Sequence, residues 1–561
     1  GYGDIVRGNW QSGIKALDES RLGPISKAPD SIKNNKANNK YYFLPLILGL
    51  IGLWYHFKNA KEDAVVVSTL FLFTGFFIIL YLNFPAHQPR ERDYAYVGSY
   101  QTFMIWIGLG VLALVDFLGK KINRNVAAAS AGILSLVAVP VLMGQQNWDD
   151  HNRSNRYTAL NFAENYLNSC APNAILFTNG DNDTYPLWYA QNVEGIRSDV
   201  RVINMSLLNT DWYTDGLKRS AYGSKPVDFS LKSEQYKQGT RDYVVHYENP
   251  ELQRQYGINN RDYYPLQNII HFIGDDNDPM GSVQSQGGES LRYYPTKRFS
   301  LKVDKETMLK NGVVRPEDAP FIVDSIKWEI GNSTLMKADL ILLDIIANNY
   351  QTRPIYWAIT TGSDVYLNLQ PYFQLEGLTY RLVPIVNTNT QEGNTGRINT
   401  TVLYDNLVNK FKWGNMGAPG VYLDETILRQ TKNFRNIFFR LAEALVMEGK
   451  KDSAIKAIDY CLKSLPKDQI QYDVFTVRLV EAYYMAGATD KANALSKELF
   501  NFFEERGKYY LSFGKKKNLV RPEIDENMQI MGYLAQMAEF NKQTELSSNF
   551  KTRVDSLQAG M

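Results

Sequence analysis

The sequence predicts a membrane protein with three parts: an α-helical membrane region, an α/β domain and a C-terminal domain of tetratricopeptide-like helices. Apolar segments are concentrated in residues 41–143, an alternation of strand-like and helical segments follows, and similar helical segments recur near the end. We therefore predict an external loop at 1–40, four membrane helices in 41–143, the α/β domain at 144–430 and the helical domain at 431–561.

The predicted membrane spans are four apolar windows: Tyr41–Phe57, Ala64–Asn83, Gln101–Leu118 and Val126–Met143. Each has about the length that crosses a ~30 Å hydrocarbon core, and none carries a charge near its middle. Four such segments with polar joints are unusual in a water-soluble domain. These windows predict the lipid bilayer as a partner.

Lysine and arginine in the short joints predict the orientation. The joints are 58–63 and 119–125, with Lys58, Lys61, Lys120, Lys121 and Arg124. By the positive-inside rule they face the cytoplasm, so that residues 84–100 and everything after Met143 lie outside.

The start of the chain predicts a missing upstream region. The sequence opens on Gly1 with neither a signal peptide nor a transit peptide, and residues 1–40 are polar and run directly into a span. We expect these residues to be a loop whose preceding spans lie further upstream.

Composition and motifs exclude several functions. The net charge is +2 and no basic stripe is present, which argues against nucleic acid as a partner. Two distant cysteines exclude a disulfide framework, and the five histidines do not have the spacing of a zinc site, so we predict no metal centre. The motifs GxSxG, GxGxxG, HExxH and the phosphate-binding loop are absent.

The α/β domain is predicted from alternating elements. The first group contains a helix at Asn152–Ser169, a strand at Ala174–Thr178, a helix at Thr184–Glu194 and a strand at Val200–Leu208. Its short crossover predicts parallel strands, with Asp183 as the helix N-cap. A second pair is a helix at Ala338–Asn349 and a strand at Pro354–Thr360, with further strands at Tyr243–Tyr247 and Phe321–Ile330.

The C-terminal region repeats itself. The matching positions are Leu441 and Leu479, Ala444 and Ala482, Gly449 and Gly487, and Ala454 and Ala492. Small residues between paired helices and a glycine at the turn are typical of tetratricopeptide repeats. Two interpretations stay open, a groove that binds a partner and a buttress for the preceding domain.

The first candidate site is the loop between the second and third spans. It contains Arg90, Glu91, Arg92 and Asp93 at the outer boundary of the membrane. Arginine binds phosphate through two parallel hydrogen bonds and keeps its charge, so the pattern suits the phosphate of a lipid-linked donor. Alternatively, Glu91 and Asp93 pair with the arginines and the loop is only solvated.

The second candidate site follows the first predicted strand. Asp181, Asn182 and Asp183 lie at its carboxyl end, where open α/β sheets bind ligands. They could hold sugar hydroxyls or a divalent cation, although the spacing of an EF-hand is not met. Helix capping alone is the other interpretation. The similar cluster 275–278 precedes Pro279 and is typical of a turn.

Several long segments resemble a known family. They are NFPAHQPRERDYAYVGS, NAILFTNGDNDTYPLWYAQNVEGIRSDVRVINMSLLNTDWY, RPIYWA and YFQLEGLTYRLVP. They look like a bacterial family of multi-pass membrane proteins, long a domain of unknown function, that is grouped with GT-C type glycosyltransferases. The family is similar to an animal lumenal protein O-mannosyltransferase that also ends in tetratricopeptide-like helices.

The resemblance implies transfer of a sugar from a polyprenyl-phosphate donor to a hydroxyl of an acceptor, with protein as the expected acceptor. It also implies a bacterial inner membrane with a large periplasmic C-terminal region, and no certain cofactor. Enzymes of this type place the catalytic carboxylate in a first external loop, so we expect the base upstream and this chain alone to be inactive. A membrane-anchored scaffold and a transporter component are the alternatives.

Overall fold

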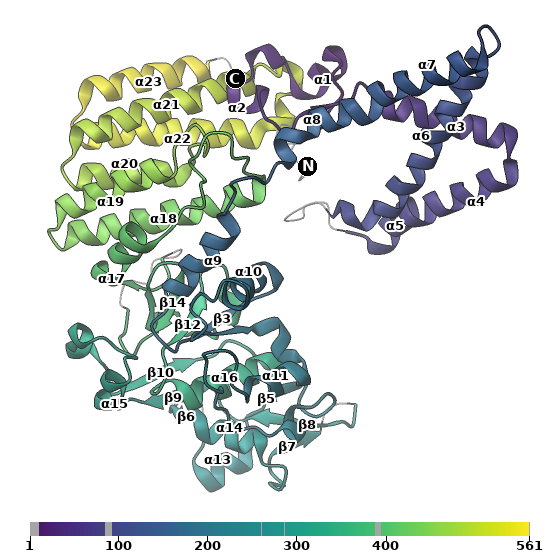
Figure 1. The fold of residues 1–561 in the computed structure, drawn as a ribbon. Helices are drawn as coiled ribbons and strands as arrows, with labels where there is room; N and C mark the ends of the chain where they lie inside the picture. Colours follow the sequence, from purple (N-terminus) through teal and green to yellow (C-terminus); the bar gives the residue numbers. More distant parts are fainter. Residues whose placement is uncertain (1–9, 85–91, 260, 285–286, 388–393, 560–561) are drawn as a thin grey trace. The chain divides into compact units, whose positions relative to one another are not determined.

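The computed structural model describes residues 10–84, 92–259, 261–284, 287–387 and 394–559. They form two compact units (Figure 1). The first contains residues 1–156, 417–436 and 465–561, and the second contains 157–416 and 437–464.

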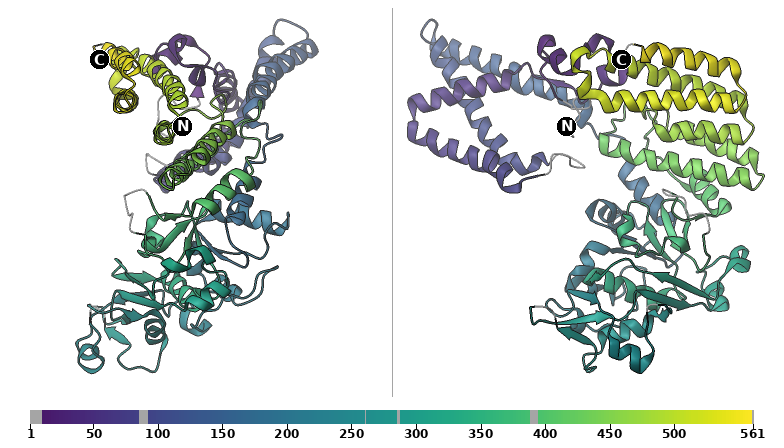
Figure 2. Two further views of the ribbon diagram at one scale, coloured as in Figure 1. Left: turned by 90° about the vertical axis from the view of Figure 1, so that its left-hand side faces the viewer. Right: turned by 180° about the vertical axis from the view of Figure 1, so that it is seen from behind.

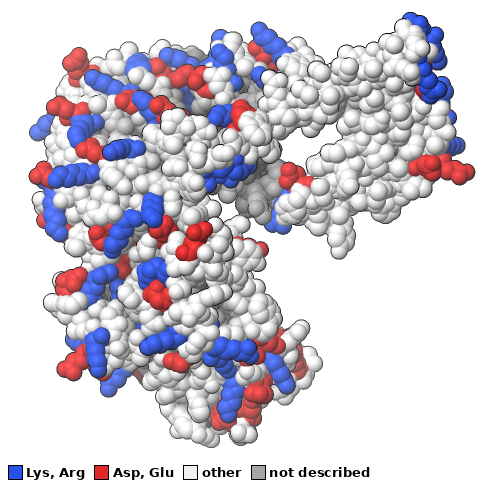
Figure 3. Space-filling view, in the orientation of Figure 1, with Lys and Arg blue, Asp and Glu red and all other residues white. Residues whose placement is uncertain are grey.

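Three of the four predicted spans form helices that are long and apolar enough to cross a membrane. They are Lys61–Leu82, Asp93–Leu118 and Arg124–His151. The window Tyr41–Phe57 forms helix α3 (Leu44–Asn59), whose 16 residues extend roughly 24 Å at 1.5 Å per residue, short of a ~30 Å core. The structure therefore supports three spans, and the fourth stays a prediction. In Figure 3 the surface of these apolar helices is uncharged except toward the helix ends. Charged side chains are costly in contact with lipid tails.

The membrane helices are made of shorter helical segments. They are α4 (Lys61–Leu72), α5 (Ile78–Leu82), α6 (Val97–Leu118), α7 (Arg124–Leu136) and α8 (Leu142–His151). A π-helical turn joins α4 to α5 and another, which contains Pro140, joins α7 to α8. Proline has no N–H to give to the helix ladder, and a wider turn accommodates that loss.

Helices α3 and α6 pack unusually closely. A Cβ atom added to Gly52 would lie 1.7 Å from the carbonyl oxygen of Trp106, and one added to Gly110 would lie 2.2 Å from that of Leu48. The backbones touch because both positions lack a side chain, as in many membrane helix pairs. The Trp106 indole also donates a hydrogen bond to Nδ1 of His56 at 3.3 Å.

The segment predicted as an external loop contains ordered elements. They are β1 (Trp10–Gln11), α1 (Lys15–Leu22), α2 (Asp30–Lys33) and β2 (Asn39–Lys40), and β1 pairs with β2 in parallel. Ala28 joins an apolar cluster with Tyr509, Tyr510 and Phe513 of the C-terminal region. The Tyr509 hydroxyl donates to the carbonyl of Leu22 at 2.5 Å. The segment is thus anchored on the last helices of its own unit.

The C-terminal region is helical, as predicted. Its helices are α18 (Glu425–Met447), α19 (Lys451–Ser464), α20 (Val474–Met485), α21 (Thr489–Leu511), α22 (Arg521–Phe540) and α23 (Thr544–Gln558). Helices α20 to α23 lie side by side in Figure 2. Gly449 and Gly487 have φ of 76° and 82° in the turns after α18 and α20, a conformation that favours glycine. Assignment to the tetratricopeptide family stays a prediction.

The second unit is built on a six-stranded mixed sheet with the order β15-β13-β14-β12-β3-β4. Strand β3 (Ile175–Thr178) pairs in parallel with both β4 (Arg201–Asn204) and β12 (Ile355–Ala358). The parallel β3–β4 pair confirms the crossover predicted from the sequence. Antiparallel pairing then joins β12 to β14 (Thr379–Leu382), and β14 to β13 (Phe373–Leu375), which pairs with β15 (Arg397–Ile398).

Two smaller sheets complete the strands of this unit, with the orders β11-β5-β8-β7 and β10-β9-β6. Their strands are β5 (Tyr243–His246), β6 (Tyr264–Pro265), β7 (Ser282–Gln284), β8 (Ser290–Tyr294), β9 (Arg298–Lys302), β10 (Ser325–Glu329) and β11 (Thr334–Met336). The strands predicted at Tyr243–Tyr247 and Phe321–Ile330 correspond to β5 and β10.

The helices between residues 158 and 404 belong to this unit, and several of them contribute to a continuous apolar core. They are α9 (Thr158–Asn168), α10 (Asp181–Asn192), α11 (Asp211–Leu217), α12 (Ser233–Tyr236), α13 (Pro250–Tyr256), α14 (Leu266–Gly274), α15 (Lys305–Lys310), α16 (Lys337–Asn349) and α17 (Thr400–Tyr404). Helix α16 is central, because its residues from Leu340 to Ala347 are all buried. A helix buried on every side needs apolar residues all round, which the run LILLDIIA supplies apart from Asp344, whose carboxylate accepts hydrogen bonds from Ser230 and Leu231.

The close contact of α3 and α6 predicts a selective response to added methyl groups. In Gly110→Ala the new Cβ would clash with the backbone of Leu48, which cannot move aside. We therefore expect a lower melting temperature, because overpacking of this kind lowers stability by about 1–3 kcal/mol. Gly108→Ala in the same helix is the control, because a Cβ there meets nothing within 4 Å. Thermal unfolding in detergent measures both, and equal stability of the two variants would contradict the packing.

Candidate functional site

The loop between the spans is described only in part. Arg90 and Glu91 lie outside the described residues, so only Arg92 and Asp93 can be placed. The Arg92 guanidinium is exposed and lies 5.4 Å from the ring centroid of Phe84, and Asp93 opens the apolar helix Asp93–Leu118. Arg92 thus immediately precedes a helix that is long and apolar enough to cross a membrane.

The loop after β3 differs in detail from the prediction. Helix α10 begins at Asp181, not Thr184, so Asp183 is not the N-cap; Gly180 takes that place with φ of 79°. Asp181, Asn182 and Asp183 therefore all lie in the first turn of the helix, where negative charge is favoured by its dipole. The Thr184 hydroxyl holds the turn by donating to the Gly180 carbonyl at 2.7 Å.

Asp183 differs from its neighbours in burial. Asp181 and Asn182 are exposed, whereas Asp183 is partly buried near the carboxyl end of β12. Burial raises the pKa of Asp183, and hydrogen bonds from the Thr360 hydroxyl and the Asn179 backbone offset this only in part. The Tyr166 hydroxyl lies 3.1 Å from Oγ1 of Thr360, so a short polar chain leads from the core to this carboxyl group.

This arrangement brings together two of the predicted residues with different properties. One exposed and one partly buried carboxylate share a helix turn at the carboxyl end of the parallel strands of this mixed sheet, the position at which open α/β sheets generally bind ligands. A carboxyl group with a raised pKa suits proton transfer with a sugar or acceptor hydroxyl. Among the residues that the structure describes, no group of three or more potential ligands could hold a metal ion.

Aromatic rings beside this loop were not predicted as part of the site. Tyr185 stacks on Trp188 at 5.5 Å within α10, and Trp188 lies 6.4 Å from Tyr213 of α11, which in turn contacts Trp212 at 5.7 Å. Tyr185 also shares a hydrogen bond with Asp181, which together with the charge of that carboxylate raises its pKa. The spacing of Tyr185 and Trp188, which places both rings on one helical face, is the sequence signal that could have indicated them.

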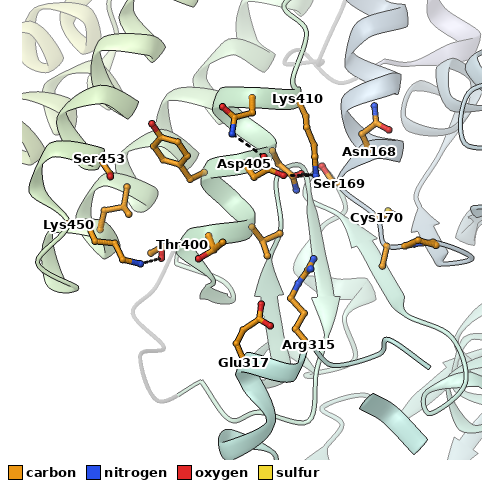
Figure 4. Close-up of a pocket in the computed structure, with 18 of the residues that line it drawn as sticks. Asn168, Ser169, Cys170, Arg315, Glu317, Thr400, Asp405, Lys410, Lys450 and Ser453 are labelled. Atoms are coloured by element: carbon orange, nitrogen blue, oxygen red, sulfur yellow. Dashed lines mark hydrogen bonds and ion pairs between the residues drawn. The ribbon is translucent and has the colours of Figure 1, made fainter. Parts of the chain in front are cut away.

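Another cavity of this unit lies elsewhere and has a volume of about 740 Å³. Figure 4 shows its polar lining, with Asp405, Lys410, Thr400 and Lys450 around it. Lys410 pairs with Asp405 at 2.6 Å, and Lys450 pairs with Glu448 at 2.7 Å. Both lysines are therefore already paired with carboxylates.

A buried ion pair lies next to the cavity. Both of its residues belong to YFQLEGLTYRLVP, one of the segments that carry the family resemblance. Glu376 and Arg381 are both fully buried, with Oε1 and Nη1 3.3 Å apart. The Tyr356 hydroxyl and the Gln374 amide also donate to Glu376, at 2.9 Å and 2.5 Å. Burial alone would raise the pKa of Glu376, but Arg381, Arg315 and these donors outweigh it and hold that pKa below its usual value. The pair is a structural feature of the sheet.

The raised pKa of Asp183 predicts a stabilising substitution. The protonated form is favoured in the folded state, so this group stabilises the fold below the unfolded pKa of ~3.9 and loses that contribution as pH rises through the folded pKa. Asp183→Asn should therefore raise the melting temperature at pH 7, with a gain that shrinks toward pH 4. Asp181→Asn, on the exposed side of the same turn, should change it less. A loss of stability in Asp183→Asn at pH 7 would show that the carboxylate is held by a stronger partner.

The Glu376–Arg381 pair predicts a strong structural effect. Glu376→Gln leaves the buried Arg381 charge uncompensated, and breaking a buried pair costs about 3–5 kcal/mol. We expect a large fall in the melting temperature at neutral pH. Glu317→Gln is the control, because Glu317 lines the neighbouring cavity and is exposed. A similar fall in the melting temperature of both variants would refute the role of burial.

Comparison with known proteins identifies a matching family model and relatives of this chain. The family model described as TMEM260-associated domain 2 matches residues 159–402. The relatives include the protein O-mannosyl-transferase tmem260 of Dictyostelium discoideum, 23% identical over 198 residues, which are 31% of this chain and 24% of the relative. The protein O-mannosyl-transferase TMEM260 of Mus musculus is 25% identical over 186 residues, which are 31% of this chain and 26% of the relative.

The matched stretches span about a quarter of the length of these two relatives. No solved structure is significantly similar to the chain. These findings show that the chain is related to the protein O-mannosyl-transferases named TMEM260, through a family domain that fills most of its α/β region.

Proposed function

We propose that this chain is the C-terminal portion of a membrane glycosyltransferase of the GT-C type, which moves a sugar from a polyprenyl-phosphate donor to a hydroxyl of an acceptor protein. The observation that carries the proposal is the match of residues 159–402 to the TMEM260-associated domain, in a chain that also has helices able to cross a membrane. A lipid-linked donor and a protein acceptor meet at the surface of the membrane. An enzyme that joins them therefore needs membrane helices and a domain outside the membrane.

In this proposal the two candidate sites have separate roles. Arg92, with Arg90 beside it in the sequence, contacts the donor phosphate at the membrane boundary. Asp183 and Asp181 bind hydroxyl groups at the edge of the sheet, where Asp183 has the raised pKa of a proton-transfer group.

The proposed location is the inner membrane of a bacterium. The positively charged joints around Lys58 and Lys120 face the cytoplasm, and the α/β and C-terminal regions lie in the periplasm. Lipid-linked sugar donors are used on that outer face in this scheme.

A membrane-anchored binding protein without catalysis is the second candidate. The observation that favours it is the cavity of about 740 Å³, whose lining includes Lys450 and Ser453 of the first C-terminal helices. A cavity of that size accommodates a peptide segment. This function requires partner binding but no affinity for a lipid-linked sugar, so donor binding separates the two candidates.

Donor binding therefore tests the proposal. In the membrane-embedded protein, Arg92→Ala should weaken binding of a polyprenyl-phosphate sugar by roughly ten- to a hundred-fold, because a charge-assisted hydrogen bond contributes ~1.5–3 kcal/mol. Arg92→Lys should restore only part of the affinity, since lysine keeps the charge but loses the planar fork.

Arg124→Ala is the matched control, an exposed arginine at the first position of α7. It should bind donor normally. Normal donor binding by Arg92→Ala together with loss of folding would make the loop structural, and absence of donor binding by the unmodified protein would favour the binding-protein function.

A further inference from the structure

A second, smaller cavity lies beside the aromatic rings of α10 and α11. Its volume is about 220 Å³, below the ~300–1,000 Å³ of pockets for drug-sized ligands, so its occupant has the size of one sugar ring. Four aromatic residues line it: Trp188, Trp212, Tyr213 and Tyr222. Trp212 and Tyr222 are 68% and 72% exposed, which leaves their rings available to a ligand.

The charged residue of this cavity is Arg201, which is only 7% exposed. Its Nη2 donates to the carbonyl oxygens of Gly216 at 3.1 Å and Leu217 at 3.3 Å, at the end of α11, and to that of Arg219 at 3.1 Å. Its Nη1 has no hydrogen-bond partner in the described parts of the chain. A buried donor without a partner costs about 1–3 kcal/mol, so a ligand oxygen here would be strongly favoured.

The positive charge of Arg201 is also not neutralised by a carboxylate. No acidic residue among those described lies within salt-bridge distance of it, and burial lowers its pKa. A second buried arginine, Arg353, is close enough that the two charges repel, and burial together with this repulsion lowers its pKa to about 10. Arg353 is held by backbone carbonyls and by the hydroxyl of Ser224, another lining residue.

We propose that this cavity binds a hexose-sized sugar that carries an anionic group. The aromatic rings cover the apolar face of the sugar, and the hydroxyls of Ser198 and Ser224 lie in the same lining for its polar edge. The uncompensated guanidinium attracts the anion, which is either the carboxylate of a uronic acid or the phosphate of a sugar phosphate. The site requires no transfer reaction, so it stands independently of the function proposed above.

Saturation-transfer NMR on the complete chain in detergent tests this site with glucuronate, mannose 1-phosphate and neutral methyl mannoside. At least one anionic sugar should bind at least tenfold more tightly than methyl mannoside. Preference for glucuronate would identify a uronic acid as the ligand and preference for mannose 1-phosphate a sugar phosphate. Benzoate is the fourth probe: if it binds as well as the sugars, the cavity takes a simple aromatic acid and the proposal is wrong.

Two substitutions locate the binding. Trp212→Ala should reduce affinity about tenfold or more, and its exposed position leaves the fold intact. Tyr256→Ala is the matched control, an aromatic residue of the same unit that is 68% exposed and is not part of the cavity lining, and it should bind normally. Arg201→Gln should remove the preference for anionic over neutral sugars. Unchanged affinity in Trp212→Ala, or no binding of any anionic sugar, would overturn the proposal even if Arg201→Gln failed to fold.

Discussion

Strand β3 is the element on which the α/β region depends. All four of its residues are buried, and it pairs in parallel with β4 on one side and β12 on the other. Parallel strands require crossovers, so their carboxyl ends gather at one edge of the sheet, where backbone groups and polar side chains become available. The turn that carries Asp181 and Asp183 follows β3 directly, and Thr360 follows β12. The chemistry at this edge is a consequence of that pairing.

Two buried carboxylates in the same unit show how the surroundings decide a role. Glu376 is fully buried but receives two arginines, a tyrosine and a glutamine, so its charge is stabilised and its pKa falls. Asp183 is less buried but has only neutral donors, and its pKa rises. A satisfied ion pair stabilises one geometry, whereas a carboxyl group with few partners remains available to a ligand. This contrast gives Glu376 a structural role and agrees with the role that we propose for Asp183.

The membrane region is held together by backbone contact more than by polar side chains. Lipid tails are as apolar as the side chains, so helix association depends on close packing, which Gly52 and Gly110 allow. Polar contacts appear at the end of the helices, where the Tyr41 hydroxyl donates to Asn147 at 2.8 Å and the Lys40 amide donates to Gln146 at 3.0 Å. The residues just before α3 therefore lie against the last turns of α8.

The sequence by itself determined the apolar helices, the strands β3, β4 and β12 and the helical end of the chain, because each depends on a local pattern of apolar residues. It also indicated Asp181 and Asp183 as candidate site residues, since a polar turn after a buried strand is visible in the sequence. Only the tertiary structure decided that α10 starts at Asp181 and that the aromatic cavity contains an uncompensated Arg201. The pKa of Asp183 depends on Thr360 and the surroundings of Arg201 include Arg353, both distant in the chain, and burial by distant segments is not encoded in any local pattern.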